Sequence, residues 1–433
     1  MRNTPLPDAT QSGEAGAGET AAAAETAAVP EPRYSLRRAL LLAALSRLVF
    51  FAVAPLATYL LGIRPASWAL RYPRRAEVFH GVLGHVLNPW AHWDGVWFIK
   101  IAVNGYAGND GSVAFFPLFP LLLRWTGVLF GNNLVVTGIV VSTAFYLVAM
   151  ALLYRLVAAD FSPRIAWWTV IFLSIFPTSF FFQAVYSESL FLMLSLLCFR
   201  WSRQGRWKLA GLAGLLATLT RSTGVLLVIP MALFYYRQRG WSLRRTDAGI
   251  ASLLMIPEGL MVWMAYLSLG FHRPLLFAQV QDQWRRTFAP PDYALWRGAL
   301  AAFQGMRQIV SRQDTHLFWP APNPGAAVPL AIANIVSLAV VVLIGWALYL
   351  ILRRVPLPYS AYAVAMVAFP LFFPSRVQPL MSMPRFVLAA FPAFIGFALL
   401  AERRPRARWV LVAAFVAGGV LLTVKFAVFS WVA

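Results

Sequence analysis

Asp94 is a carboxylate placed among tryptophans, in the stretch NPWAHWDGVWFIKIAVNGY (residues 88–106). A carboxylate held in an aromatic, partly desolvated cleft can have its pKa tuned for general acid or general base catalysis. An Asp in front of a helix can equally serve as its N-cap, and Phe98 and Ile101 give the following run a helical face. These residues by themselves favour neither role, so a catalytic base and a helix cap both stay open.

The chain that must position Asp94 has the composition of a membrane protein. Of its 433 residues, 60% are hydrophobic and 12% are charged, whereas soluble domains carry about 25% charged residues. Runs such as 328–352 and 408–431 are long enough to cross a hydrocarbon core, which takes about 20 apolar residues. Because backbone groups inside lipid must be satisfied within the segment, we predict an all-α polytopic membrane protein.

The first 32 residues differ from the rest. They consist mainly of Ala, Gly, Glu and Thr, so they bury too little apolar surface to fold. We expect residues 1–32 to form a disordered cytoplasmic tail and residues 33–433 to form the membrane domain. The formal net charge of +21 would suit a nucleic-acid-binding protein. Lys and Arg that hold loops at the cytoplasmic face explain it more simply, so we predict membrane lipids and no nucleic acid as partners.

Clusters of basic residues predict the path of the chain through the membrane. Arginines precede the first apolar run, and further clusters occur at 200–208, 237–245, 353–354 and 402–408. The positive-inside rule places all of these in the cytoplasm, in a multi-pass protein of the cell membrane with a cytoplasmic N-terminus. About eleven spans connect them: 39–62, 133–155, 166–182, 188–201, 206–220, 222–236, 246–270, 328–352, 358–374, 384–401 and 408–431.

This path leaves two large segments, 63–132 and 271–327, on the outer side of the membrane. Both are rich in aromatic residues, Arg and Pro, so we expect interfacial helices there. The run 115–131 is apolar but is interrupted by Pro117, Pro120 and Arg124, and we expect it to lie at the interface or dip into it. Asp94 therefore falls on the extracytoplasmic face.

Four blocks of the chain resemble the PIG-V-type mannosyltransferases, including their bacterial relatives. They are WAHWDGVWFIKIAVNGY with AFFPLFPLLLR, then FPTSFFFQAVYSESLFLMLSLLCF, then GRWKLAGLAGLLATLTRSTGVLLVIPM, and finally MSMPRFVLAAFPAF. The blocks follow the family's order and cover most of the chain after residue 40. The resemblance implies a GT-C glycosyltransferase fold with its active site on the outer face. It also implies transfer of mannose, or a similar hexose, from a polyprenyl-phosphate-linked donor with inversion.

The resemblance also implies roles for particular residues. Asp94 matches the family's catalytic base, which takes a proton from the acceptor hydroxyl as the lipid phosphate leaves. The leaving phosphate gains negative charge, so the site needs arginines directed at it. Candidates for the donor phosphate are Arg385, Arg376, Arg285 and Arg286, and candidates for the sugar or acceptor are Trp93, Tyr186, Glu188, Asp110, Gln183 and Trp284. Headgroup contacts, a helix start or a turn would explain these residues more simply.

Other features leave alternatives open. The five histidines are scattered and no spacing typical of a metal site occurs, so we predict no metal, although some GT-C enzymes use a divalent ion. Arg221 in LTRSTG is either a site residue or a structural anchor. The acceptor is a lipid, a glycan or a protein. The alternative function is a transporter or flippase of a lipid-linked saccharide, for which we would expect opposed charges deep in the spans and internal pseudo-symmetry.

Overall fold

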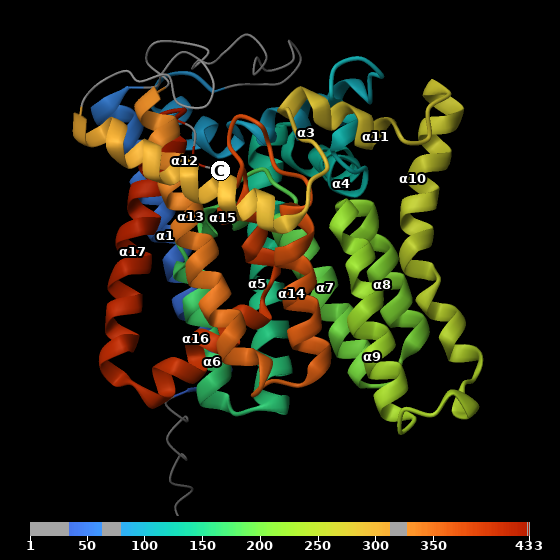
Figure 1. The fold of residues 1–433 in the computed structure, drawn as a ribbon. Helices are drawn as coiled ribbons and strands as arrows, with labels where there is room; N and C mark the ends of the chain where they lie inside the picture. The colour runs from blue at the N-terminus through green and yellow to red at the C-terminus, as the bar shows by residue number, and fades with distance from the viewer. Residues whose placement is uncertain (1–33, 63–78, 312–326, 431, 433) are drawn as a thin grey trace, which may run out of the picture.

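The computed structural model describes residues 34–62, 79–311, 327–430 and 432, and most of these are helical (Figure 1). The predicted tail, 1–32, lies outside the described residues. The α-helices are α1 (Leu36–Leu61), α2 (Gly81–Leu87), α3 (Asp94–Asn104), α4 (Leu118–Gly127), α5 (Leu134–Asp160), α6 (Pro163–Ile175), α7 (Glu188–Arg203), α8 (Trp207–Thr220), α9 (Val228–Gln238), α10 (Met255–Phe271), α11 (Leu276–Gln279), α12 (Pro291–Ser311), α13 (Ala327–Leu352), α14 (Leu357–Leu371), α15 (Met383–Phe386), α16 (Pro392–Arg403) and α17 (Pro405–Ala427). Short 3-10 helices include η5 (Ser179–Phe182), η6 (Ser222–Leu227) and η9 (Val280–Trp284).

Within the described residues, five helical stretches are long and apolar enough to cross a membrane, and this confirms an all-α polytopic membrane protein. They are α1, α5, Ala248–Phe271, α13 and α17, with a sixth if α15 and α16, bent by 84°, count as one broken span. The count of about eleven is not confirmed. The other predicted spans coincide with helices such as α6 and α8, which have 13 and 14 residues. At about 1.5 Å per residue, such helices fall short of a hydrocarbon core of about 30 Å.

Capping residues set where several of these helices begin. The side chain of Asn133 accepts a hydrogen bond from the N–H of Val136 (3.0 Å) at the start of α5. Ser162 does the same for Ile165 (3.1 Å) before Pro163, the first residue of α6. Both arrangements satisfy backbone donors that a helix start leaves free.

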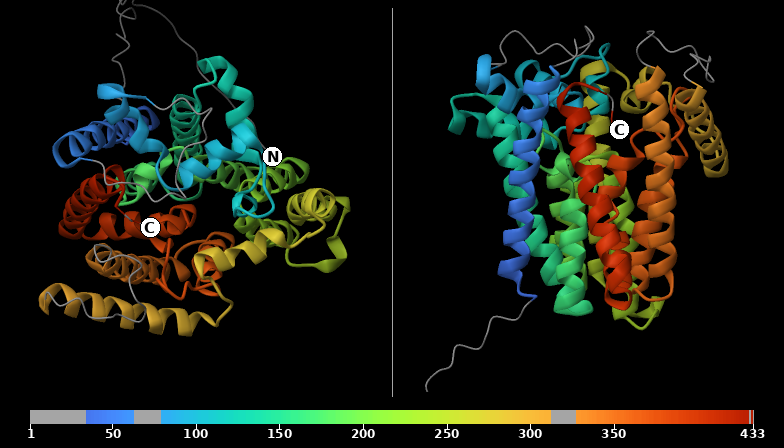
Figure 2. Two further views of the ribbon diagram at one scale, coloured as in Figure 1. Left: turned by 90° about the horizontal axis from the view of Figure 1, so that it is seen from above. Right: turned by 90° about the vertical axis from the view of Figure 1, so that its left-hand side faces the viewer.

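The long helices run side by side as a bundle with two distinct ends (Figures 1 and 2). We call the end at which α1 begins the α1 end, and the opposite end, which holds α3, α4 and α11, the α3 end. Helix α12 lies across the α3 end and packs against α13. The predicted interfacial run 115–131 contains α4, a short helix at the α3 end.

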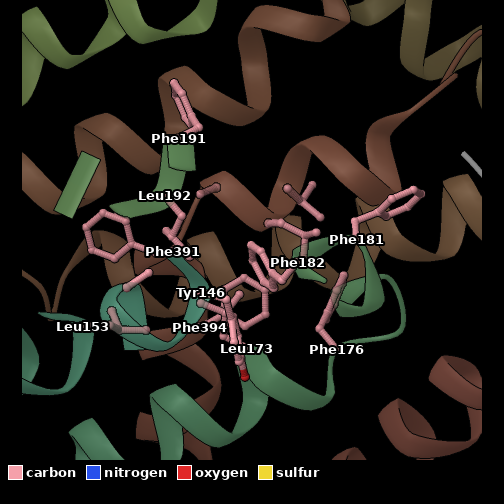
Figure 3. Packing of buried hydrophobic residues seen from close by; sticks show 14 of the residues in the cluster. Tyr146, Leu153, Leu173, Phe176, Phe181, Phe182, Phe191, Leu192, Phe391 and Phe394 are labelled. Atoms are coloured by element: carbon pink, nitrogen blue, oxygen red, sulfur yellow. The ribbon is translucent and has the colours of Figure 1, made fainter. Parts of the chain in front are cut away.

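The connection between α6 and α7 is buried although its one regular element is the short 3-10 helix η5. Aromatic side chains from this connection, including Phe176 and Phe182, pack with Tyr146 of α5 and Phe394 of α16 (Figure 3). Backbone groups buried in this way need partners. Arg47 of α1 supplies them, since its guanidinium donates to the Ser174 carbonyl (2.5 Å) and to the Ser179 carbonyl. The core thereby holds the chain in a defined position just before Tyr186 and Glu188.

Candidate active site

Asp94 is the first residue of α3 and faces Arg385 of α15, 291 positions later in the chain. Arg385 Nη1 donates to Asp94 Oδ2 at 2.5 Å. The residue at the N-cap position is Trp93, which has a φ of 57°, and no side chain caps this helix. The Asp94 carboxylate therefore forms the ion pair and does not cap the helix, which was the other role that the sequence had left open.

Asp94 and Arg385 belong to a chain of four charged side chains from separate segments. Arg385 Nε lies 3.2 Å from Glu188 Oε1 at the start of α7, and Arg221 Nη1 donates to the same Glu188 oxygen at 2.6 Å. The side chain of Glu188 is 5% exposed and that of Arg385 is 12% exposed. Removing such groups from water costs several kcal/mol per ion, which only mutual pairing offsets.

Tyr186 joins the start of α3 to the connection before α7. Its hydroxyl donates to the His92 carbonyl (3.1 Å) and accepts from the Asp94 N–H (3.1 Å). Burial, followed by the nearby Asp94 carboxylate, raises the pKa of Tyr186 well above its ordinary value, so the phenol stays neutral. The hydroxyl holds the backbone of Asp94 in place without adding charge.

His92 does not share in acid–base chemistry at neutral pH. It is buried against Phe429, with ring centroids 4.2 Å apart. Burial lowers the pKa of His92 to about 3. Its imidazole is therefore neutral, and Asp94 is left as the titratable group of this loop that faces the cavity.

These four charged side chains form one wall of a cavity of about 570 Å³ at the α3 end. This lies within the range of small-molecule sites, about 300–1000 Å³. Six residues predicted from the sequence line it together: Asp94, Tyr186, Glu188, Trp284, Arg286 and Arg385. Aromatic side chains make much of the remaining wall: Phe98, Phe115, Phe277, Phe288, Phe373 and Phe386.

Arg286 reaches the cavity from the segment after η9. Its guanidinium donates to the carbonyls of Phe373 (3.3 Å) and Met381 (3.2 Å). Burial, and then the positive charge of Arg385, lower the pKa of Arg286 to about 10, so it remains protonated at neutral pH. Within the described part of the chain it has no carboxylate at ion-pair distance, and its charge is available to an anion.

Two predicted phosphate ligands lie elsewhere. Arg285 and Arg376 line a second, neighbouring cavity instead of the one with Asp94. Arg286 forms an isolated antiparallel bridge with Ser375, and Arg285 before it lies in the left-handed region with a φ of 52°. The two side chains leave the backbone in different directions, so that Arg285 lines only the second cavity and Arg286 only the first.

Three predicted sugar or acceptor residues also lie outside the cavity wall. Asp110 pairs with Lys100 (2.9 Å) and accepts from the Ser112 N–H (2.9 Å), as a turn residue does. Burial opposes ionisation of Asp110, but hydrogen bonds from Ser112 and Lys100 outweigh it and leave its pKa below the usual value. Gln183 is buried and does not line the cavity, and Trp93 packs on Phe429 at 5.0 Å between ring centroids.

The cavity contains two residues to which the sequence gave no firm role. Arg221 stands just before η6 and is both a wall residue and the anchor of Glu188. Asp282 of η9 also lines the cavity. No motif marks Asp282, and only its place in the outer segment 271–327 could have suggested it. The described ranges hold no group of three or more His, Cys, Asp or Glu side chains that could bind a metal.

Comparison with known proteins matches part of the chain to one family. Residues 37–239 match the family described as Mannosyltransferase (PIG-V). GPI mannosyltransferase 2 of Drosophila melanogaster is 29% identical over 171 residues, which is 36% of this chain and 38% of the relative. The protein of the same name from Schizosaccharomyces pombe is 27% identical over 186 residues, covering 42% and 40%. GPI alpha-1,6-mannosyltransferase 2 of Cricetulus griseus is 32% identical over 167 residues, covering 35% and 32%.

These matches confirm the resemblance to the PIG-V-type mannosyltransferases, and they span at most 40% of each of these relatives. Among solved structures, the oligosaccharyltransferase of Archaeoglobus fulgidus with Zn and sulfate superposes with a TM-score of 0.43 at 13% identity, covering 92% of this chain and 53% of that one. The apo form of the same oligosaccharyltransferase superposes with a TM-score of 0.42 at 14% identity, covering 92% of this chain and 55% of that one. Because these TM-scores are low, the fold is described from the helices of this chain and not from the superpositions.

Proposed function

Because residues 37–239 match the PIG-V mannosyltransferase family, we propose that the protein is a membrane glycosyltransferase. It moves mannose, or a similar hexose, from a polyprenyl-phosphate-linked donor to an acceptor hydroxyl, with inversion. The observation that carries this proposal is the single cavity that holds Asp94 together with Arg385, Arg286 and Arg221. A base beside cations is what displacement of a phosphate by a hydroxyl requires.

The arginines bind and neutralise the donor phosphate. When the bond between the anomeric carbon and the phosphate oxygen breaks, the leaving phosphate monoester gains negative charge. Arg286 faces the cavity without a carboxylate partner among the described residues, and Arg385 stands between Asp94 and Glu188. Their guanidinium groups can each offer two parallel N–H donors to phosphate oxygens. Such preorganised donors stabilise the transition state more than the ground state.

Asp94 takes the proton of the acceptor hydroxyl as its oxygen attacks the anomeric carbon from the face opposite the phosphate. In the structure, Arg385 binds the Asp94 carboxylate. A donor phosphate competes for the same guanidinium, and this releases Asp94 to face the acceptor. Donor binding therefore prepares the base, so the donor should bind before the acceptor reacts.

Glu188 and Trp284 are placed to hold the sugar. Glu188 Oε2 is buried and, within the described residues, has no hydrogen-bond partner, while Oε1 is occupied by Arg221. A buried oxygen of this kind is costly unless a ligand hydroxyl donates to it. Trp284 and Phe115, 6.1 Å apart between ring centroids, offer an aromatic surface for a sugar ring or an isoprenoid unit.

The position of the charges favours an enzyme over a carrier. The carboxylates and arginines of the cavity gather at the α3 end, among the described residues, and do not continue as opposed pairs along the bundle. A flippase would need a polar route between the two ends. Basic residues near the α1 end support a cytoplasmic location for that end, which puts the cavity on the outer face of the cell membrane. A lipid, glycan or protein supplies the acceptor hydroxyl.

Transfer by the purified full chain in lipid vesicles tests the proposed reaction. Radiolabelled mannose would be offered as polyprenyl-phosphate mannose or as GDP-mannose, with a panel of lipid, glycan and peptide acceptors. We expect transfer from the lipid-linked donor alone, and a product whose anomeric configuration, read by NMR, is opposite to that of the donor. Transfer from the nucleotide sugar, or retained configuration, would contradict the proposal.

A further inference from the structure

Thr178, in the connection between α6 and α7, contacts the segment that carries Arg385. Its hydroxyl donates to the carbonyl of Pro384, the residue before Arg385, at 2.5 Å. Thr178 and Pro384 are both buried. Because water does not compete for the carbonyl there, this hydrogen bond constrains where the backbone beside Arg385 can lie.

The helix that carries Arg385 is too short to fix its own direction. α15 has four residues, and it follows Ser382, whose φ of 66° lies in the left-handed region. A single helical turn fixes several backbone angles for one hydrogen bond and is unfavourable by itself. Packing of α15 against α13 and α14 adds apolar contact, which has no preferred direction. The directional bond from Thr178 therefore supplies what the short helix lacks.

The same connection also holds the loop that carries Asp94. The Val185 N–H donates to the Trp90 carbonyl at 2.8 Å, and the Tyr186 hydroxyl accepts from the Asp94 N–H at 3.1 Å. Asp94 and its arginine partner are 291 positions apart in the chain, so local structure cannot set the distance between them. Residues 178–186 join the two segments through one short stretch of backbone.

This stretch is itself fixed from α1. The Arg47 guanidinium donates to the carbonyl of Ser174 at 2.5 Å and to the carbonyl of Ser179, which lie before and after Thr178 in the chain. It also donates to the Ser179 hydroxyl at 3.1 Å. Arg47 and both serines are buried. The Thr178 hydroxyl is thus presented to Pro384 from backbone that is anchored on both sides.

We propose that Thr178 is a positioning residue for the transfer reaction, which sets the place of Arg385 relative to Asp94 through the carbonyl of Pro384. The inference rests on the proposed function, in which Arg385 binds the donor phosphate and Asp94 takes the acceptor proton. Thr178 lies outside the cavity wall and acts through Arg385. Reacting groups need close placement, since a displacement of about 1 Å can lower a rate by about 100-fold.

Replacement of Thr178 in a graded series tests this role. Valine has nearly the shape of threonine but no hydroxyl, so Thr178→Val should lower turnover from polyprenyl-phosphate mannose by about tenfold. Thr178→Ser keeps the hydroxyl and should stay within about twofold of the wild type. Thr178→Cys, whose thiol is a weak donor, should fall between the two. If Thr178→Val does not fold, the comparison of the Ser and Cys variants decides.

The matched control is Thr169→Val in α6. The Thr169 side chain is as buried as that of Thr178, and its hydroxyl donates within its own helix, to the Ile165 carbonyl at 2.8 Å. The control should therefore transfer sugar at the wild-type rate. Chemical denaturation of each variant separates a loss of turnover from a loss of folded protein.

A double-mutant cycle with Arg385→Lys tests whether Thr178 acts through Arg385. Once the guanidinium is absent, Thr178→Val should cost no further turnover, so the double variant should match Arg385→Lys within about twofold. The same cycle, measured as binding of polyprenyl phosphate in detergent, requires no turnover. Thr178→Val should weaken this binding at least about threefold when Arg385 is present and leave it unchanged in the Arg385→Lys background.

Several results would overturn the inference. Wild-type turnover by a folded Thr178→Val variant would do so, as would an equal loss in Thr169→Val. Losses that multiply in the double variant would show that the hydroxyl acts independently of Arg385. Wild-type protein that binds polyprenyl phosphate but transfers no sugar would contradict the proposed function, and the binding cycle alone would then decide the role of Thr178. Wild-type protein that neither binds nor transfers would contradict both.

Discussion

Ion pairs form at both ends of the helix bundle, and the two sets differ in burial and in what they line. At the α1 end, Arg203 of α7 pairs with Asp160 of α5, and it is the arginine of this pair, 40% exposed, that meets water, while the Asp160 side chain is 14% exposed. At the α3 end, Arg385 pairs with Asp94 and Glu188 in the wall of a cavity, and its side chain is 12% exposed.

Exposed pairs contribute about 0–1 kcal/mol and cost little to form. Buried pairs carry a desolvation cost that replacement by apolar residues would avoid. The α3 end therefore carries charges that a fold selected for stability alone would not keep. This difference supports the proposal that the charges at the α3 end serve the reaction, whereas the pair at the α1 end joins two helices.

The largest effect should come from Arg385→Ala. The substitution leaves Asp94 without its cation and Glu188 with Arg221 alone, so transfer should fall by about 100- to 1000-fold. Unfolding in detergent should also become easier by about 3–5 kcal/mol. Steady-state transfer rates and chemical denaturation would measure the two effects. Arg385→Lys keeps the positive charge but loses the forked guanidinium group, so its transfer rate should fall between those of the wild type and Arg385→Ala. Full transfer by a folded Arg385→Ala variant would erase the difference between the two ends.

A smaller effect should come from the titration of His92. Burial lowers its pKa to about 3, from 6.5. The unfolded chain thus binds a proton on this imidazole between those values while the folded protein does not. The free energy of unfolding should therefore fall as pH drops below 6.5, by about 1.4 kcal/mol per pH unit from this residue. Denaturation of wild type and His92→Gln across this range would isolate the slope, which a solvated His92 would lack.

Arg203→Ala should have the smallest effect. Asp160 keeps its hydrogen bond from Tyr359, and Arg203 is partly exposed. The free energy of unfolding should change by less than about 1 kcal/mol, and transfer should match the wild type. A loss of transfer comparable to that of Arg385→Ala would show that the α1 end also takes part in the reaction.

The sequence was sufficient to place much of the cavity wall, for a physical reason. Asp94, Tyr186, Glu188 and Arg385 each stand where an apolar run meets a polar segment, and positive-inside counting assigned these junctions to one side. Side chains from junctions on one side of a membrane collect at the same end of a bundle. Composition likewise predicted the helices. Long apolar helices such as α1, α5 and α13 can be predicted from the sequence alone, without knowledge of their tertiary contacts.

The sequence could not predict which way particular side chains point or how long each helix is. Arg285 and Arg286 are adjacent, and the left-handed backbone at Arg285, together with the bridge from Arg286 to Ser375, 89 positions later in the chain, sets which cavity each one lines. Asp110 looks like other outer-face acids until its pairing with Lys100 is seen. The number of spans depended on where helices break, and packing supports such breaks, as where Arg47 donates to the Ser179 carbonyl in the buried connection after α6.

The most direct test of the account is sugar transfer by Asp94→Asn. Asn keeps the size and hydrogen-bonding shape of Asp but cannot take a proton, so turnover from polyprenyl-phosphate mannose should be lost while the donor still binds. The matched control is Asp110→Asn, the same change in a turn at the same end, where Asn is equally suited; it should transfer as the wild type does. Turnover by Asp94→Asn at the wild-type rate would contradict the central claim that Asp94 is the base.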